Sequence, residues 1–165
     1  MVFGLTLAVA LLSATGTSQG ARQPSPTCLG IEASLRVSPT VVKAGSAPAF
    51  TLVLKNGSER PVRLLDVRAG RRPDLAHSYY ELVLEQSGRT LKNLLRAISD
   101  PGPIETADYF VLSPDSSVDI PLTTSADLSS LRIGQYAAHV RITLDPLSPA
   151  AQSCQSAPTS FTVGK

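Results

Sequence analysis

The chain of 165 residues contains two cysteines, and the chemistry open to them is a single disulfide bond. Cys28 and Cys154 allow only one connectivity, and a pair of cysteines in an exported protein is most simply a disulfide. Closing so long a loop would stabilise the fold by about 5 kcal/mol on the chain-entropy account. The alternatives are two free buried thiols, or a zinc site, for which no nearby histidine completes a tetrahedral ligand set.

The serines and histidines form no catalytic motif. No Gly-x-Ser-x-Gly elbow occurs, His77 falls in a turn, and His139 falls on the outer face of an expected strand. A hydrolase site could assemble from His77, Ser78 and a nearby acid, and two of the dispersed carboxylates could form a glycosidase-type pair. With those as the alternatives, we predict no catalytic residues and a protein that is not an enzyme.

Motifs for metals and cofactors are also missing from the sequence. It holds no Cys-x-x-Cys pair, no His-rich spacing, no Asp-rich calcium loop and no Gly-rich phosphate loop. We therefore expect no metal and no cofactor. The 15 Lys and Arg residues against 13 Asp and Glu residues give a net charge of +2. That charge is too small for binding by phosphate neutralisation, so we expect no nucleic-acid partner.

A cluster of arginines is the candidate surface for a partner. The residues that we single out are Arg68, Arg71 and Arg72, which could form a patch for an anion or an acidic partner. Acidic residues interleave with them, so a solvated strand and loop face is the alternative. Segment 87–108 is a second candidate, because binding residues tend to lie on long connections such as this Pro-containing one.

Two short motifs predict local structure. Asn56-Gly57-Ser58 matches a glycosylation acceptor, but Asn-Gly is also a turn dipeptide, and we favour the turn. In Gly134-Gln135-Tyr136 a tyrosine follows a turn into a strand. Such a tyrosine can bury its ring while its hydroxyl bonds an upstream backbone group, which is the tyrosine corner of sandwich folds. The alternative is that Tyr136 contacts a ligand.

The first residues resemble an export signal. Residues 2–14 are uncharged and mostly apolar, and a small and polar stretch follows up to residue 20. The run is too short for the roughly 20 apolar residues of a spanning helix but suits a secretory signal. No Lys or Arg precedes Arg22, so the usual positive segment is missing; a buried helix is the alternative. We expect a signal peptide at 1–20, a flexible lead-in at 21–30 and one domain at 31–165.

The rest of the chain is patterned as an all-β protein. Eight short runs rich in β-branched and aromatic residues are bounded by turn residues, and several alternate apolar and polar positions. The expected strands are 31–37, 49–55, 62–67, 79–85, 109–112, 117–122, 136–143 and 160–163. Half-buried antiparallel strands at this spacing favour a two-sheet sandwich, with a small barrel as the alternative.

Two segments depart from strand periodicity. In 91–98 the apolar residues fall on one face of a short helix, and Thr90 could cap it; alternatively Thr90 and Leu91 continue the preceding hairpin. Ser125 could cap a single turn over 125–131, with Asp127 near its positive end.

Turn and strand motifs together carry a family resemblance. Segments 37–45, 50–58 and 61–64 combine a Pro-containing strand, a Gly turn and a strand ending in Asn that leads to Pro-Val. Segments 112–117 and 131–136 add Leu-Ser-Pro-Asp-Ser-Ser and Gly-Gln-Tyr, with Asp115 where the pattern often has Gly. These motifs resemble bacterial exported immunoglobulin-like or fibronectin-like domains, including inhibitor-like and propeptide-like domains that accompany secreted peptidases. The resemblance implies an immunoglobulin-like antiparallel sandwich of about seven or eight strands.

From these observations we expect a periplasmic or extracellular protein, with no membrane span after signal cleavage. It would act by binding or structural assembly, with a protein or cell-envelope component as its partner. A peptidase-inhibitor or propeptide-like role is the first alternative, and an accessory subunit of an envelope complex is the second. The accessory role predicts an exposed apolar patch or an open edge strand.

Overall fold

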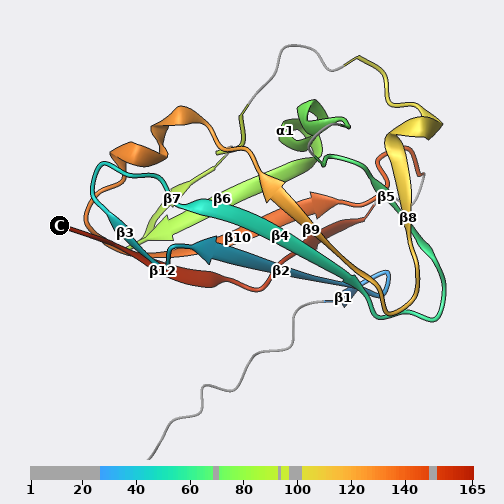
Figure 1. Cartoon of the computed structure of the whole chain (residues 1–165), viewed down its shortest axis with the longest axis horizontal. Coiled ribbons are helices and arrows are strands. Elements are labelled where there is room, and N and C mark those ends of the chain that lie inside the picture. The colour runs from blue at the N-terminus through green and yellow to red at the C-terminus, as the bar shows by residue number, and fades with distance from the viewer. Residues whose placement is uncertain (1–26, 69–70, 93, 97–101, 149–151) are drawn as a thin grey trace, which may run out of the picture.

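Two mainly antiparallel sheets pack face to face in the structure, a computed structural model that describes residues 27–68, 71–92, 94–96, 102–148 and 152–165 (Figure 1). The first sheet has the order β1-β2-β4-β9, and the second β3-β12-β10-β6-β7, with β11 also paired to β10. The bounds in the first sheet are β1 Thr27–Cys28, β2 Ile31–Ser38, β4 Ala49–Asn56 and β9 Ser117–Leu122. Those in the second are β3 Val41–Lys43, β6 Tyr80–Gln86, β7 Arg89–Leu91, β10 Gly134–Thr143, β11 Ser153–Gln155 and β12 Thr159–Gly164. The chain is therefore an all-β sandwich, as the sequence predicted.

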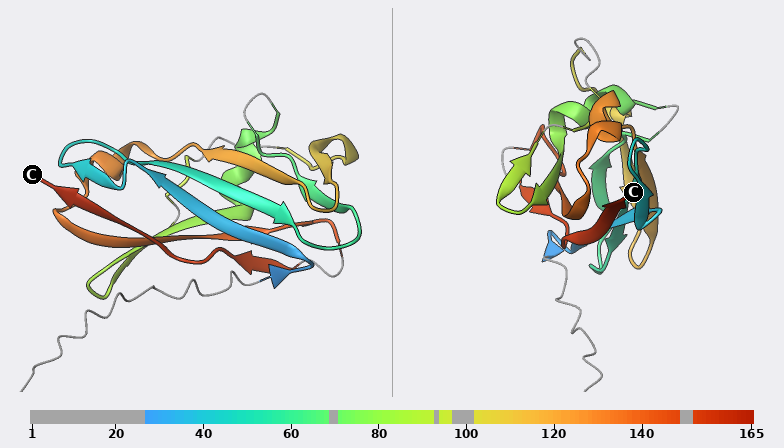
Figure 2. Two further views of the ribbon diagram at one scale, coloured as in Figure 1. Left: turned by 60° about the horizontal axis from the view of Figure 1, so that its bottom comes forward. Right: turned by 90° about the vertical axis from the view of Figure 1, so that its left-hand side faces the viewer.

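A separate ribbon and four short helical segments complete the fold. The ribbon pairs β5, Val62–Leu65, with β8, Tyr109–Leu112. The helical segments are η1 Pro73–Leu75, α1 Ala76–Tyr79, η2 Thr106–Asp108 and η3 Ala126–Ser130. The ribbon and the α1 region lie at one end of the sandwich, whereas η3 and the β6–β7 hairpin lie at the end where the C-terminus emerges (Figures 1 and 2).

Alternation along the strands builds the core between the two sheets. β2 and β4 bury every second residue, because successive side chains on a strand point to opposite faces. Across the interface, the ring of Phe50 from the first sheet meets Phe161 of the second edge to face, at 5.9 Å between centroids. The ring of Tyr136 stacks on Phe161, with 5.2 Å between the centroids. Aromatic pairs of this geometry contribute about 1 kcal/mol beyond their area.

The disulfide prediction is confirmed. Cys28 on β1 and Cys154 on β11 are bonded, with their Cα atoms 5.7 Å apart. Since β1 belongs to the first sheet and β11 pairs with the second, the bond joins the two layers as well as distant parts of the chain. Neither cysteine is free for zinc or for redox chemistry in this state.

The eight predicted strands all form, and four short strands were missed: β1, β3, β7 and β11. Each missed strand has two or three residues, too few for a periodic pattern. One is β3, which forms where the chain leaves β2 at the cis peptide bond Ser38–Pro39 and pairs in parallel with β12 in the opposite sheet.

The helix predicted over 91–98 is wrong within the described residues. Leu91 ends β7, and Leu95 makes an isolated bridge with Thr124, so the alternative of a continued hairpin holds. The apolar spacing reflects burial of Leu95 and half-burial of Leu91 and Leu94 against the core rather than a helical face. Residues 93 and 97–101 lie outside the described residues.

Three further expectations concern Ser125, the signal peptide with its lead-in, and His139. A short helical turn, η3, does follow Ser125, but the Ser125 side chain makes no capping hydrogen bond. The expected signal peptide and most of the lead-in lie outside the described residues. Contrary to expectation for an outward-facing residue, His139 is only 5% exposed. It pairs in register with Val83, which is also buried, so this outer part of the second sheet is covered.

Candidate functional site

A groove with a volume of about 380 Å³ opens between the β6–β7 hairpin and the segment that runs from η3 into β10. We call it the hairpin groove. Its apolar lining is formed by Leu84, Leu91, Leu94, Leu128, Leu131 and Tyr136. Its polar lining is formed by Gln86, Arg89, Ser130 and Arg132. Its volume is near the lower end of the range for small-molecule sites, and half of its lining residues are leucines.

Strand register directs the hairpin side chains toward this groove. Leu84 is opposite Leu91, and Gln86 is opposite Arg89. Residues opposite each other in an antiparallel pair share a face, and residues two apart on one strand share it too. Because Leu84 is in the core, Arg89 and Leu91 project to the same side as the core, where the groove opens.

Two exposed arginines mark the polar side of the groove. Within the described part of the chain, neither Arg89 nor Arg132 forms an ion pair with a carboxylate. No described acidic residue lines the groove either. The site therefore combines an aliphatic wall with uncompensated positive charge, which raises the local concentration of anions.

The turn that carries Arg132 is held in place by Tyr136. The Tyr136 hydroxyl donates a hydrogen bond of 2.8 Å to the carbonyl of Arg132, four residues upstream, and the tyrosine is 3% exposed. Gly134 adopts φ +147°, and a Cβ there would lie 2.4 Å from Gln86 Nε2. Gln86 donates in turn to the carbonyl of Ile133 over 3.4 Å. Tyr136 has the geometry of a tyrosine corner, and it also contributes to the groove wall.

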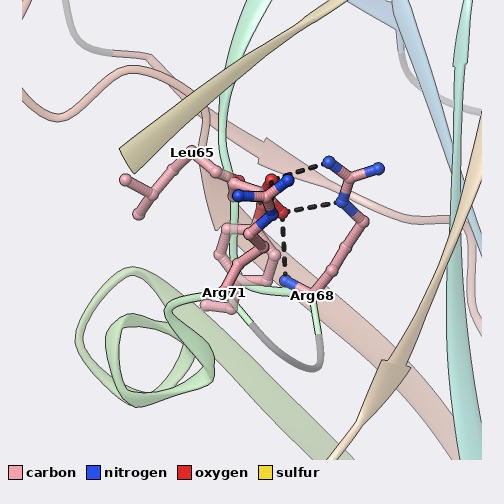
Figure 3. A network of polar contacts seen from close by, with 5 residues as sticks. Leu65, Arg68 and Arg71 are labelled. Atoms are coloured by element: carbon pink, nitrogen blue, oxygen red, sulfur yellow. Dashed lines mark hydrogen bonds and ion pairs between the residues drawn. The ribbon is translucent and has the colours of Figure 1, made fainter. Parts of the chain in front are cut away.

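The arginines singled out in the sequence lie elsewhere, near the β5–β8 ribbon. Arg68 forms a bidentate pair with Asp66, at 2.7 Å from Nε to Oδ1 and 2.6 Å from Nη2 to Oδ2 (Figure 3). Its guanidinium also lies 4.4 Å from the centroid of the Phe110 ring. Hydrogen bonds from Arg68 hold the pKa of the buried Asp66 carboxyl below its usual range. Arg68 is thus used within the fold.

The other two arginines of that patch differ in exposure. Arg72 pairs with Asp74 at 3.0 Å and with Asp108 at 2.8 Å, which joins the segment before α1 to η2. The Arg71 side chain is 71% exposed and lies 4.0 Å from Asp66. A contiguous patch of uncommitted arginines is therefore not formed, and only Arg71 presents most of its surface to solvent.

The residues of the alternative hydrolase site share a second cavity. His77 and Ser78 are exposed on α1, and with Glu81 and Arg141 they line a cavity of about 280 Å³. Arg141 pairs with Glu81 at 3.2 Å. Among the hydrogen bonds of the described residues, none joins His77 to Ser78, so the nucleophile and base are near each other but not arranged as a pair.

The described residues hold no group of three or more His, Cys, Asp or Glu side chains placed to bind a metal ion. Within the same ranges, no helix has both the length and the apolar character to cross a membrane.

Sequence reasoning missed the hairpin groove. Arg89 lies in segment 87–108, which was singled out, but Arg132 and Leu128 had no signal of their own. They lie about 40 residues further along the chain, and only the pairing of β6 with β10 brings the two segments together.

No protein-family model matches the chain, and no curated protein matches it. A solved structure described as "AvmM Catalyzes Macrocyclization in Alchivemycin A Biosynthesis" matches with 13% sequence identity and a TM-score of 0.39. The match covers 84% of this chain and 90% of that chain.

That match corrects one expectation. The compared protein, AvmM, is described as an enzyme, which contradicts our prediction, drawn from the missing catalytic motifs, that this chain is not an enzyme. At this TM-score we transfer no reaction and no substrate to the chain.

Proposed function

We propose that the protein is an exported binding domain of the immunoglobulin-like type and that the hairpin groove receives its ligand. The proposal rests on one observation above all: the groove is open, mostly aliphatic and bordered by Arg89 and Arg132, which have no carboxylate partner among the described residues. A groove where half-buried leucines lie beside arginines that have no internal acid is typical of a binding site.

The strand order supports the immunoglobulin-like part of the proposal. In that fold, one sheet holds the first, second and fifth strands, and the other holds the sixth and seventh strands beside the third. Here β2, β4 and β9 form the centre of one sheet, and β12, β10 and β6 are neighbours in the other. The short strand β7 extends this second sheet and carries Arg89 to the groove.

The disulfide supports the export part of the proposal. Bonds between cysteines persist in oxidising compartments and are rare in the cytosol. The bond joins the two sheets of the domain, as expected of a structural disulfide. The apolar run at residues 2–14 supports the same location as a signal segment.

One edge of the sandwich argues against assembly through strand addition. β9 lies at the edge of the first sheet and carries Asp119 and Pro121. Charged residues and proline at edge strands block pairing with a further strand. An accessory-subunit role would therefore need a surface other than this edge, and no described feature favours it over ligand binding.

The test is a screen of small apolar fragments with the isotopically labelled mature protein, followed by nuclear magnetic resonance. We expect perturbed amide signals to cluster on β6–β7 and on residues 128–136. Leu131→Trp should fill the groove and weaken these perturbations at least tenfold. Val111→Trp is the matched control, because Val111 is 63% exposed on the β5–β8 ribbon. Perturbations located elsewhere, or unchanged in Leu131→Trp, would contradict the proposal.

A further inference from the structure

Resting on the proposed function, we infer that the ligand of the hairpin groove is a free aliphatic carboxylate, a hydrocarbon chain of medium length that ends in one carboxyl group. The chain would lie on the leucine wall, and the carboxylate would pair with Arg89 and Arg132.

The shape and composition of the wall favour an aliphatic chain. Five of the six apolar lining residues are leucines, and the sixth, Tyr136, is 3% exposed and already stacked on Phe161. A ring of the ligand would therefore find no free aromatic face to stack on. A groove of about 380 Å³ suits a small ligand rather than a large one.

The charges favour a carboxylate at one end of that chain. Guanidinium groups bind carboxylates through two parallel hydrogen bonds, in a geometry that an ammonium group cannot match. The chain itself shows this pairing at Arg68, whose guanidinium is held by Asp66 in two bonds. Arg89 and Arg132 have no such internal acid among the described residues, so an external carboxylate can take its place. A ligand cation would be repelled by both.

The remaining polar groups of the groove favour a free acid over the end of a peptide. Gln86 is hydrogen-bonded to Ile133, and Ser130 also has a partner. A peptide would bring amide groups that need hydrogen-bond partners when they are buried, whereas a hydrocarbon chain needs none. The groove offers two guanidinium groups at its border, and these can hold the carboxylate of a free acid.

The experiment is a titration of the mature, disulfide-bonded protein with octanoate, by calorimetry and by the amide signals of the groove. Comparators are octan-1-ol, octylammonium and the peptide acetyl-Gly-Gly-Leu with a free carboxyl end. We expect octanoate to bind at the groove at least tenfold more tightly than octan-1-ol, and more weakly as salt is added. Octylammonium and the peptide should bind more weakly still.

The variant arm uses Arg89→Ala with Arg132→Ala, and Arg89→Gln alone as a milder change. The double variant should lose at least tenfold in affinity for octanoate but keep its weak affinity for octan-1-ol. Arg60→Ala is the matched control, because Arg60 is an exposed arginine outside the groove lining. Unfolding curves of all variants establish that the fold is intact.

The outcomes distinguish a failure of the carboxylate proposal from a failure of the proposed function. Equal affinity for octanoate and octan-1-ol, or unchanged octanoate binding in both arginine variants, overturns the carboxylate while the groove remains a binding site. If the peptide binds more tightly than octanoate, the ligand is the carboxyl end of a peptide and not a free aliphatic acid. If no probe and no fragment perturbs the groove, the proposed function itself is wrong.

Discussion

Replacing Asn56 should remove a large part of the stability of the domain, because this residue joins two turns at the end of the sandwich. Its side chain is fully buried. Nδ2 donates to the carbonyls of Arg60 and Leu112 over 2.8 and 2.9 Å. Oδ1 accepts from the amide and hydroxyl of Ser58 over 2.9 and 2.7 Å. The Asn56 backbone also bonds to Ser116 and Asp115 in the turn before β9.

The magnitude follows from the groups left without partners in Asn56→Ala. The carbonyl of Leu112 loses a buried donor, at a cost of about 1 to 3 kcal/mol. The three partly buried bonds contribute roughly 0.5 kcal/mol each once the turn is rehydrated. We therefore expect a loss of about 3 kcal/mol and a decrease in Tm of about 12 °C for a domain of this size.

The assay is urea unfolding of Asn56→Ala and Asn56→Asp, with Glu59→Ala as the control in the same exposed turn. Asn56→Asp should be the least stable at neutral pH, because it places a carboxylate against two carbonyl oxygens. It should recover in acid, when the carboxyl group is protonated. A loss below 1 kcal/mol in Asn56→Ala, or wild-type stability of Asn56→Asp at pH 7, would refute the role assigned to this residue.

Three further outcomes are expected. Replacing Cys28 and Cys154 together by serine should reduce the free energy of unfolding by about 5 kcal/mol in chemical denaturation, and a reducing agent should then no longer affect the variant. Burial lowers the pKa of His139 below its ordinary 6.5. As the pH decreases below about 6.5, the histidine is therefore protonated more readily in the unfolded chain than in the folded protein, and the stability of the fold should fall. Glu81, Glu85 and Arg141 face this histidine, and His139→Gln should flatten that part of the curve in pH-dependent unfolding. The pKa of Asp66 is lowered, so its contribution to the stability of the fold is present at neutral pH and is lost as the pH falls below about 4. Asp66→Asn weakens the pair with Arg68 and should therefore cost about 2 kcal/mol of stability at pH 7. The variant should also lose this acid-dependent change in stability.

Much of the fold could be predicted because strand patterns are local. Phe50, Leu52 and Leu54 alternate with more exposed residues, and this alternation is sufficient to place their strand and its buried face. The same reasoning failed at 91–98, where apolar spacing that fits a helix arises from an irregular segment packed on the core. Short runs of apolar residues do not by themselves distinguish these two cases.

Burial of polar residues was harder to predict from sequence. Asn56 was expected to be a turn residue, and the structure adds that it is fully buried with four side-chain hydrogen bonds. Asp66 is one of the acidic residues that lie among the singled-out arginines in the sequence, and the structure shows that it is 5% exposed and binds Arg68. Which polar residue is buried depends on the segments packed over it, and these come from distant parts of the chain.

By itself, the sequence determined the all-β class and the positions of the eight longer strands, and it left the two cysteines only one possible pairing. The strands follow from the two-residue alternation of side chains along a strand, and the cysteine pairing follows because the chain has only two cysteines. Only the tertiary structure decided where a ligand could bind. The hairpin groove is formed by residues between 84 and 94 together with residues between 128 and 136. No described carboxylate lies beside its two arginines, and this depends on how distant segments of the chain pack together.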